Sequence, residues 1–147
     1  MPALVRGFWR LFRYIQGANE KQVKIPMTAP VLARIQGGPG TQGIDVYFML
    51  PEAFRGDPPT PTENTVYLES LPPLEAYVRF FGGWMTDRTR QLQLRYLDEQ
   101  LAKAGVATQE GFHYTAGFNS PFELTNRRNE VWRIAQGQLD CKETLAE

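Results

Sequence analysis

The sequence is poor in the residues that build metal centres and disulfides. It has one cysteine and one histidine among 147 residues. Cys141 alone can form neither an intrachain disulfide nor a cysteine-based zinc site. Because His113 is the only imidazole, a histidine-rich metal centre is excluded, and a Ser-His-Asp triad would have to use this one residue. Sixteen basic residues balance sixteen acidic ones, which argues against a nucleic-acid binder with a broad basic surface.

Long hydrophobic runs are absent as well. No segment approaches the ~18 consecutive apolar residues of a transmembrane helix, and the N-terminus lacks the apolar region of a secretory signal. The N-terminus is rich in arginine and free of acids up to Glu20, which superficially resembles a mitochondrial presequence. We expect a folded helix there instead. The expected compartment is reducing and intracellular: the cytoplasm, with the mitochondrion as an alternative.

The remaining composition is that of a globular protein. Hydrophobic residues make up 42% of the chain and charged residues 22%. The length suits a single domain, which we place at residues 1–136, with a flexible tail at 137–147. The zero net charge is an average, because residues 1–34 contain six basic residues and only one acid. An anionic partner is therefore to be sought at the N-terminus.

Hydrophobic periodicity predicts two helices. Residues 3–16 carry apolar side chains at helical spacing, and Gly17 supplies the stop. Residues 86–104 form a longer helix, for which Thr86 or Asp87 is the expected N-cap.

Alternating or continuous apolar runs predict the strands. In chain order they fall at residues 22–35, 44–50, 65–71, 74–81, 112–117 and 130–135. Pro26 and Pro30 each remove a ladder donor, so the first of these strands should lie at an edge or bend at the prolines. Residues 51–61 form an irregular, proline-rich loop.

The order of these elements contains a half-repeat. The second half is strand, helix, strand, strand, whereas the first half is helix followed by three strands. If the halves are structural copies, the first lacks the strand that should precede its helix. We predict an α+β fold: a distorted, twisted antiparallel β-barrel of two pseudo-repeated halves with two packed helices, its first N-terminal strand absent. The unfilled position would remain an edge or be closed by a partner, so an oligomer could form through it.

The first helix carries more apolar surface than docking on its own sheet requires. Its core stripe consists of Leu4, Phe8, Leu11 and Ile15. A second stripe, nearly opposite, consists of Arg6, Arg10 and Arg13. A surplus apolar arc lies between them, formed by Val5, Trp9 and Phe12. Aromatic rings beside guanidinium groups suit a flat, anionic, amphiphilic ligand. The alternative is that the arc covers the missing strand's position and the arginines are solvated surface.

No pattern predicts catalysis. His113 is expected on the opposite strand face from its aromatic neighbours, and a lone strand histidine is more often a surface or rim residue than a ligand. The acidic residues are not spaced as the carboxylate pairs that general acid–base catalysis uses. The sequence also contains no glycine-rich phosphate-binding loop. The second helix, residues 86–104, has two apolar rows, Leu94/Leu97/Leu101 and Met85/Leu92/Tyr96. One row should face the sheet. The other could dock on a protein partner, although burial under the proline-rich loop is the favoured interpretation.

Six ordered blocks together resemble the SOUL heme-binding family. They are residues 14–21 (YIQGANEK), 24–31 (KIPMTAPV), 58–61 (PPTP), 80–83 (FFGG), 114–121 (YTAGFNSP) and 126–132 (NRRNEVW). The resemblance runs from about residue 4 to residue 135. It implies a distorted β-barrel of two pseudo-repeats and an open apolar groove that binds heme and other tetrapyrroles without a defined reaction. The implied groove lies at the first helix and the loop between the last strands.

The resemblance also implies roles for particular residues. Arg13 matches a basic position whose side chain would meet heme propionates, and Phe8 and Phe12 match apolar groove positions. Arg6 is only adjacent to a second basic position, where this chain has Val5. A third basic position corresponds to residues 42–45, which carry no basic group. Relatives also have an additional strand before the first helix, in a segment that holds a proposed axial histidine.

The sequence therefore predicts a non-enzymatic binder of heme or porphyrin. Predicted ligand contacts on the first helix are Arg6, Phe8, Trp9, Arg10, Phe12 and Arg13, and those on the opposite wall are Tyr114, Phe118 and Phe122. The alternative is a protein-interaction module linked to apoptosis or mitochondrial permeability, acting through the helix at 86–104. A third possibility is a tetrapyrrole-modifying enzyme, but the sequence shows no recognisable catalytic acid, base or nucleophile for one.

Overall fold

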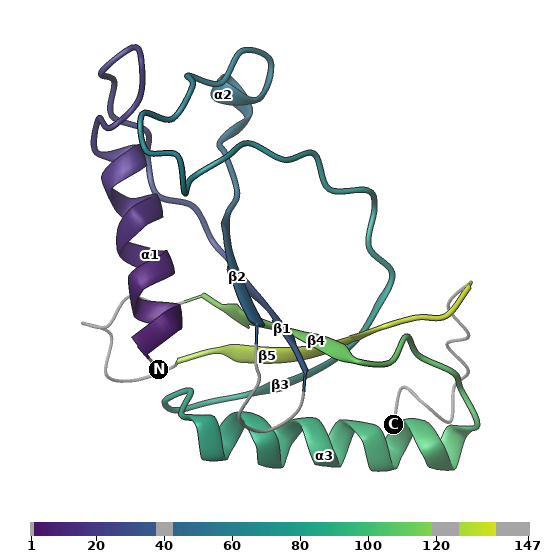
Figure 1. The fold of residues 1–147 in the computed structure, drawn as a ribbon. Helices are drawn as coiled ribbons and strands as arrows, with labels where there is room; N and C mark the ends of the chain where they lie inside the picture. The colour runs from purple at the N-terminus through teal and green to yellow at the C-terminus, as the bar shows by residue number, and fades with distance from the viewer. Residues whose placement is uncertain (1, 38–42, 119–126, 138–147) are drawn as a thin grey trace.

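The chain folds as a five-stranded antiparallel sheet with helices on one face (Figure 1). The computed structural model describes residues 2–37, 43–118 and 127–137. In these residues the elements are α1 (Pro2–Ile15), β1 (Val31–Gln36), β2 (Gly43–Phe48), α2 (Glu52–Arg55), β3 (Ala76–Phe81), α3 (Asp87–Ala104), β4 (Phe112–Gly117) and β5 (Asn129–Ile134). The strand order is β2-β1-β4-β5-β3. The predicted α+β class is confirmed, and the described strands form an open sheet whose edges are β2 and β3.

Two of the predicted strands need correction. β1 begins only after Pro30, and it is a central strand that pairs with both β2 and β4. The prolines therefore precede the ladder, where their missing N–H groups cost nothing. The strand predicted at 65–71 does not form. That segment has alternating apolar residues but no neighbouring strand; Val66 packs into the core while Tyr67 and Leu68 stay exposed.

Both long helices lie on the same face of the sheet. Val46 of β2 and Val131 of β5 belong to one cross-strand row. α1 approaches this row at Gly7, where an added Cβ would lie 2.7 Å from Val46 Cγ2. α3 approaches it with Leu97, which packs in a buried cluster with Val131. The opposite face carries no helix among the described residues.

The core is divided into two clusters, one under each long helix. The α3 cluster consists of Tyr77, Leu97, Leu101, Val131 and Ala135. The α1 cluster consists of Tyr14, Ile15, Ile25 and Val66, with Leu11, Phe12, Phe48, Leu50 and Phe54 packed against it. The Tyr14 hydroxyl donates a 2.6 Å hydrogen bond to the carbonyl oxygen of Pro59. The proline-rich loop therefore covers α1, rather than α3 as the sequence suggested.

The predicted half-repeat is visible in the sheet. α1, β1 and β2 in the first half correspond to α3, β4 and β5 in the second, and the repeats meet where β1 pairs with β4. β3 precedes α3 and pairs with the outer edge of β5. The equivalent position at the outer edge of β2 holds no described strand.

The predicted stop and start signals of α3 are confirmed. The Thr86 hydroxyl accepts a hydrogen bond from the backbone N–H of Thr89, so Thr86 rather than Asp87 is the N-cap. Gly105 ends the helix in the left-handed region, at φ 71°, where glycine has no steric penalty. No helix in the described part of the chain has the length and apolar character that crossing a membrane requires.

Candidate functional site

α1 presents a partly exposed row of apolar side chains, here called the aromatic flank: Val5, Phe8, Trp9 and Phe12. The rings of Phe8 and Phe12 are stacked with centroids 6.0 Å apart. Trp9 meets both rings edge-on, at 5.6 and 5.3 Å. Phe48 of β2 supports Phe8 at 5.2 Å. Half of the surface of Val5 and of Trp9 remains exposed among the described residues, whereas Phe12, the third residue of the predicted surplus arc, is partly buried and packs against the α1 core cluster.

Arg13 lies beside this flank and is held by an acid from a distant loop. Its Nε and Nη2 atoms donate hydrogen bonds of 2.7 and 3.1 Å to the two carboxylate oxygens of Glu63. This bidentate pair lowers the pKa of Glu63 and raises that of Arg13. Since both groups are exposed to solvent, the pair is weakly held, and another carboxylate could take the place of Glu63.

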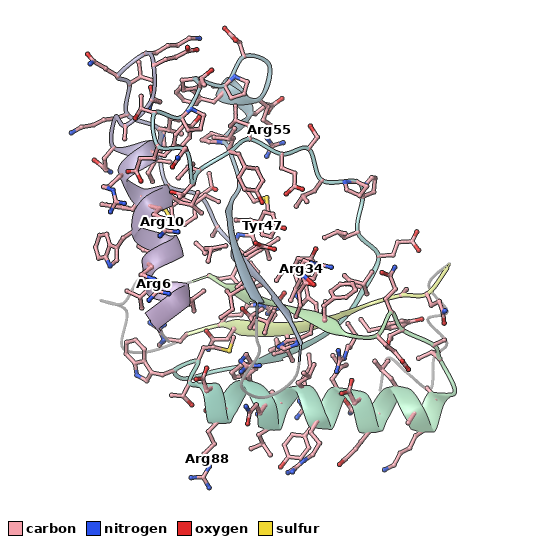
Figure 2. All side chains as sticks on the ribbon, in the orientation of Figure 1. Arg6, Arg10, Arg34, Tyr47, Arg55 and Arg88 are labelled. Atoms are coloured by element: carbon pink, nitrogen blue, oxygen red, sulfur yellow. The ribbon has the colours of Figure 1, made fainter. Side chains whose placement is uncertain are left out.

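Arg6 and Arg10 belong to the same row of α1 as Arg13, and both line a cleft. α1, β2, and residues 65–71 line this cleft, whose volume is about 770 Å³. Figure 2 shows Arg6 and Arg10 on α1, Tyr47 on β2 and Arg55 at α2 around it. Burial and the nearby carboxylates of Glu69 and Asp45 raise the pKa of Tyr47 to about 12. Tyr47 is therefore a neutral hydrogen-bonding group at physiological pH.

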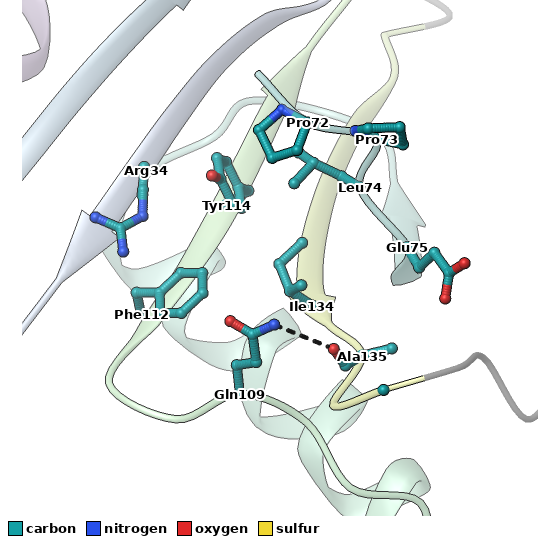
Figure 3. A pocket seen from close by; sticks show the side chains of 11 residues that line it. Arg34, Pro72, Pro73, Leu74, Glu75, Gln109, Phe112, Tyr114, Ile134 and Ala135 are labelled. Atoms are coloured by element: carbon teal, nitrogen blue, oxygen red, sulfur yellow. Dashed lines mark hydrogen bonds between the residues drawn. The ribbon is translucent and has the colours of Figure 1, made fainter. Parts of the chain in front are cut away.

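A second cavity, of about 660 Å³, lies on the helix-free face (Figure 3). Arg34 of β1 and Phe112 and Tyr114 of β4 form one side, and residues 72–75 pass over the other. The Arg34 guanidinium lies over the Phe112 ring, 4.4 Å from its centroid. Tyr114 is a cross-strand neighbour of Arg34 and is buried.

The structure brings together only some of the predicted contact residues. Phe8, Trp9, Phe12 and Arg13 share one surface of α1. Tyr114 lies on the sheet face opposite α1, so it cannot form the opposite wall of the same groove. Phe118 lies near Arg128, whose guanidinium is 5.9 Å from its ring. Phe122 lies outside the described residues. The contact of any of these residues with a ligand stays a prediction.

His113 is buried rather than at the rim, contrary to the expectation from sequence. It does lie on the opposite face from Tyr114, as predicted, which places it beneath α3. Its Nε2 atom is 3.1 Å from Nη1 of Arg90, so it accepts from the guanidinium. Burial, together with Arg90 and Arg133, lowers the pKa of His113 to about 4. The described residues contain no group of three or more side chains that could hold a metal ion.

The outward row of α3 is only partly apolar. Tyr96 is exposed, and the guanidinium of Arg79 lies 5.1 Å from its ring centroid. Arg79 also donates hydrogen bonds to Gln93 and Gln100 along the same face. A partner would thus meet a mixed, hydrogen-bonded surface here. The role of α3 in protein interaction stays a prediction.

Sequence reasoning missed three residues that shape the site. Glu63 holds Arg13 from 50 positions away, a pairing with no sequence signal. Gly7 permits the close approach of α1 to β2, and a glycine inside a predicted helix could have signalled this. Arg90 is 3% exposed, although arginine is rarely buried, and the sequence analysis did not single it out.

Comparison with known proteins agrees with this architecture. The family model described as SOUL heme-binding protein matches residues 1–134. The chain belongs to the SOUL heme-binding family. Among its SOUL relatives, human heme-binding protein 2 is 40% identical over 139 residues, covering 92% of this chain and 68% of the relative. Mouse heme-binding protein 1 is 29% identical over 135 residues, covering 90% of this chain and 71% of the relative.

Proposed function

We propose that the protein binds heme or a related tetrapyrrole on the aromatic flank of α1 and does not transform it. The family and the names of both relatives support a heme binder rather than an enzyme. The observation that carries the proposed location is exposed Trp9, packed against the partly buried rings of Phe8 and Phe12 beside Arg13. This arrangement offers ring contacts and a carboxylate-binding group on one surface.

The chemistry of a tetrapyrrole fits both parts of this surface. Its flat macrocycle would stack against Trp9 and Phe12, which gains apolar burial and ring–ring attraction. Its propionate groups require cationic donors, and the planar guanidinium of Arg13 binds carboxylates through two parallel hydrogen bonds. Glu63 already shows this geometry with Arg13. A propionate would replace the Glu63 carboxylate.

The iron is not expected to find a histidine on this surface. The single histidine, His113, lies beneath α3 and its Nε2 atom faces Arg90. In this proposal the ligand is held by its ring and its carboxylates, so iron-free protoporphyrin should bind about as well as hemin. Such binding suits a carrier or buffer, acting inside the cell in the cytoplasm or mitochondrion.

The test is a titration with hemin and, separately, with protoporphyrin. The Soret band and the quenching of tryptophan fluorescence would be followed in the unmodified protein and in Trp9→Ala. We expect Trp9→Ala to weaken binding by about tenfold, the loss of one good ring contact. Trp84→Ala is the matched control, because Trp84 is 48% exposed, similar to Trp9 at 50%, but lies beyond β3.

Charge variants test the carboxylate contact. Arg13→Glu should weaken binding of both porphyrins, whereas Glu63→Gln should strengthen it, because the guanidinium no longer has a competing carboxylate. No saturable spectral change, or equal losses in Trp9→Ala and Trp84→Ala, would contradict the proposal. Binding of hemin without binding of protoporphyrin would contradict the expectation that the iron needs no protein ligand.

A further inference from the structure

The cavity on the helix-free face holds two polar side chains that the proposed function does not use. Arg34 and Tyr114 are cross-strand neighbours on β1 and β4, and both line this cavity. Tyr114 is only 5% exposed, yet its hydroxyl makes no hydrogen bond among the residues that the structure describes. The guanidinium of Arg34 makes neither an ion pair nor a hydrogen bond with those residues. Figure 3 shows both groups at the same end of the cavity, where they are available to an acceptor.

The position of the Arg34 guanidinium suits a carboxylate. It is held over the ring of Phe112, 4.4 Å from the centroid, and this contact leaves the N–H donors at its edge free. Asp45 of β2 is the other cross-strand neighbour of Arg34, but no ion pair joins the two side chains. A planar guanidinium with free donors binds a carboxylate through two parallel hydrogen bonds. The adjacent Tyr114 hydroxyl can donate a third.

The middle of the cavity is apolar and lies between two surfaces. Phe112 and Ile134 belong to the sheet, and residues 72–75, which include Leu74, pass over them (Figure 3). The rings of Phe112 and Tyr114 meet edge-on, with centroids 6.0 Å apart. A volume of about 660 Å³ is within the range of small-molecule sites. A flat aromatic body would bury apolar surface here and contact the ring of Phe112.

The charge at the far end of the cavity limits the ligand to one carboxylate. Glu75 also lines the cavity, and Figure 3 shows its carboxylate at the opposite end from Arg34. A second carboxylate on the far side of the ligand would therefore approach an acid, and like charges brought together disfavour binding. The lining selects a molecule with one acidic end and a neutral one.

We propose that this cavity binds a small aromatic monocarboxylate, with its carboxylate on Arg34 and Tyr114 and its ring between the sheet and residues 72–75. The site goes beyond the proposed tetrapyrrole function and does not rest on it. The tetrapyrrole surface lies on α1, and this cavity lies on the opposite face of the sheet, where neither long helix packs. The two proposals can therefore fail separately.

Isothermal titration calorimetry with 2-naphthoate as the probe tests the proposal on the unmodified protein. Naphthalene-2-methanol has the same ring without the charge and should bind at least about tenfold more weakly, because it cannot form charge-assisted hydrogen bonds with Arg34. Naphthalene-2,6-dicarboxylate should also bind about tenfold more weakly, because its second carboxylate approaches Glu75. Glu75→Gln should recover most of that second loss and leave the affinity for 2-naphthoate little changed.

Substitutions separate the carboxylate contact from general attraction of charge. Arg34→Gln should weaken 2-naphthoate binding by about tenfold or more, and Tyr114→Phe, which removes only the hydroxyl, by about two- to fivefold. Arg88→Gln is the matched control, since it removes one exposed arginine from α3, away from the cavity (Figure 2), and should leave binding unchanged. Should Arg34→Gln fold poorly, Arg34→Lys keeps the charge and should still weaken binding, because an ammonium group cannot form two parallel hydrogen bonds.

Chemical-shift mapping by NMR locates the bound probe. The amides of residues 34 and 112–114 should shift with the Kd that calorimetry gives, and Trp9→Ala should leave both measurements unchanged. Absence of saturable binding, shifts confined to α1, or equal affinity for naphthalene-2-methanol would overturn the proposal. An unchanged affinity in Arg34→Gln would overturn it too. Displacement of 2-naphthoate by protoporphyrin would assign this cavity to the tetrapyrrole and would likewise overturn it.

Discussion

Acidification from pH 7 to pH 5 should destabilise the protein through His113. This side chain is buried beneath α3 and accepts a hydrogen bond from the guanidinium of Arg90. Burial is the largest cause of its low pKa, followed by Arg90 and Arg133, while Asp98 opposes them weakly. Protonation would place a second buried cation against Arg90, whose Nε atom has no hydrogen-bond partner and whose nearest acid, Asp87, is 3.7 Å away.

The magnitude follows from the difference in pKa between the folded and unfolded chain. The unfolded chain takes up the proton near pH 6.5, and the folded chain only near pH 4. Stability is therefore fully present above about pH 7 and declines as the pH falls from 6.5 towards 4. The complete loss corresponds to roughly 3 kcal/mol, of which roughly 2 kcal/mol should appear by pH 5. That is a large fraction of the ~5–15 kcal/mol that stabilises a typical domain.

Urea unfolding followed by tryptophan fluorescence at pH 7, 6 and 5 measures how the free energy of unfolding changes with pH. The protein has no other histidine, and carboxylates titrate mainly below this range. His113 should therefore account for most of the change in stability between pH 7 and pH 5. His113→Gln provides the control, because its side-chain oxygen can still accept from Arg90 but does not titrate. This variant should show a nearly flat dependence between pH 7 and pH 5.

Direct titration of the imidazole by NMR would complete the test. We expect the ring protons of His113 to report a pKa well below 6.5 in the folded protein. A measured pKa near 6.5, or a pH slope that persists in His113→Gln, would refute the assignment of acid sensitivity to this buried pair.

Three further substitutions test packing and local structure by chemical denaturation. Gly7→Ala should cost about 1–3 kcal/mol, because its Cβ would meet Val46 at 2.7 Å; a gain of about 1 kcal/mol would show that helix propensity outweighs this contact. Thr86→Ala should cost about 1 kcal/mol by removing the N-cap of α3, whereas Thr86→Ser should be close to neutral. Asp98→Asn should cost about 1 kcal/mol, since Arg133 loses a bidentate partner at 2.8 and 2.9 Å that is partly open to solvent.

Local signals in the sequence predicted the long helices closely. Residues 3–16 and 86–104 were expected, and the helices span Pro2–Ile15 and Asp87–Ala104. Both predictions rest on periodicity and end signals, which act within a few residues of each other. The predicted exposure of Val5 and Trp9 was also correct, because the angular width of an apolar surface can be counted on a helical wheel.

Contacts between distant segments could not be predicted in the same way. The apolar pattern of residues 65–71 is that of a strand, yet a strand also needs a neighbour, and the segment finds none. The burial of His113 depends on Arg90, which reaches it from a different element. Likewise, the pairing of Arg13 with Glu63 depends on the path of the proline-rich loop across α1. In each case the deciding partner is set by tertiary structure.

The half-repeat explains why α1 leaves more apolar surface exposed than α3 does. α3 is enclosed by two strands, so its apolar residues Leu97 and Leu101 are used in the core. Among the strands, α1 makes its main contacts with β2, and Val5 and Trp9 on its outer side remain half exposed. Trp9 marks the exposed side of α1, and Arg13 connects this side to the cleft, because Arg13 follows Trp9 by four positions and Arg10 by three. Both arginines act on the carboxylate of Glu63. A substitution at Glu63 should therefore change the electrostatics of the aromatic flank and of the cleft together.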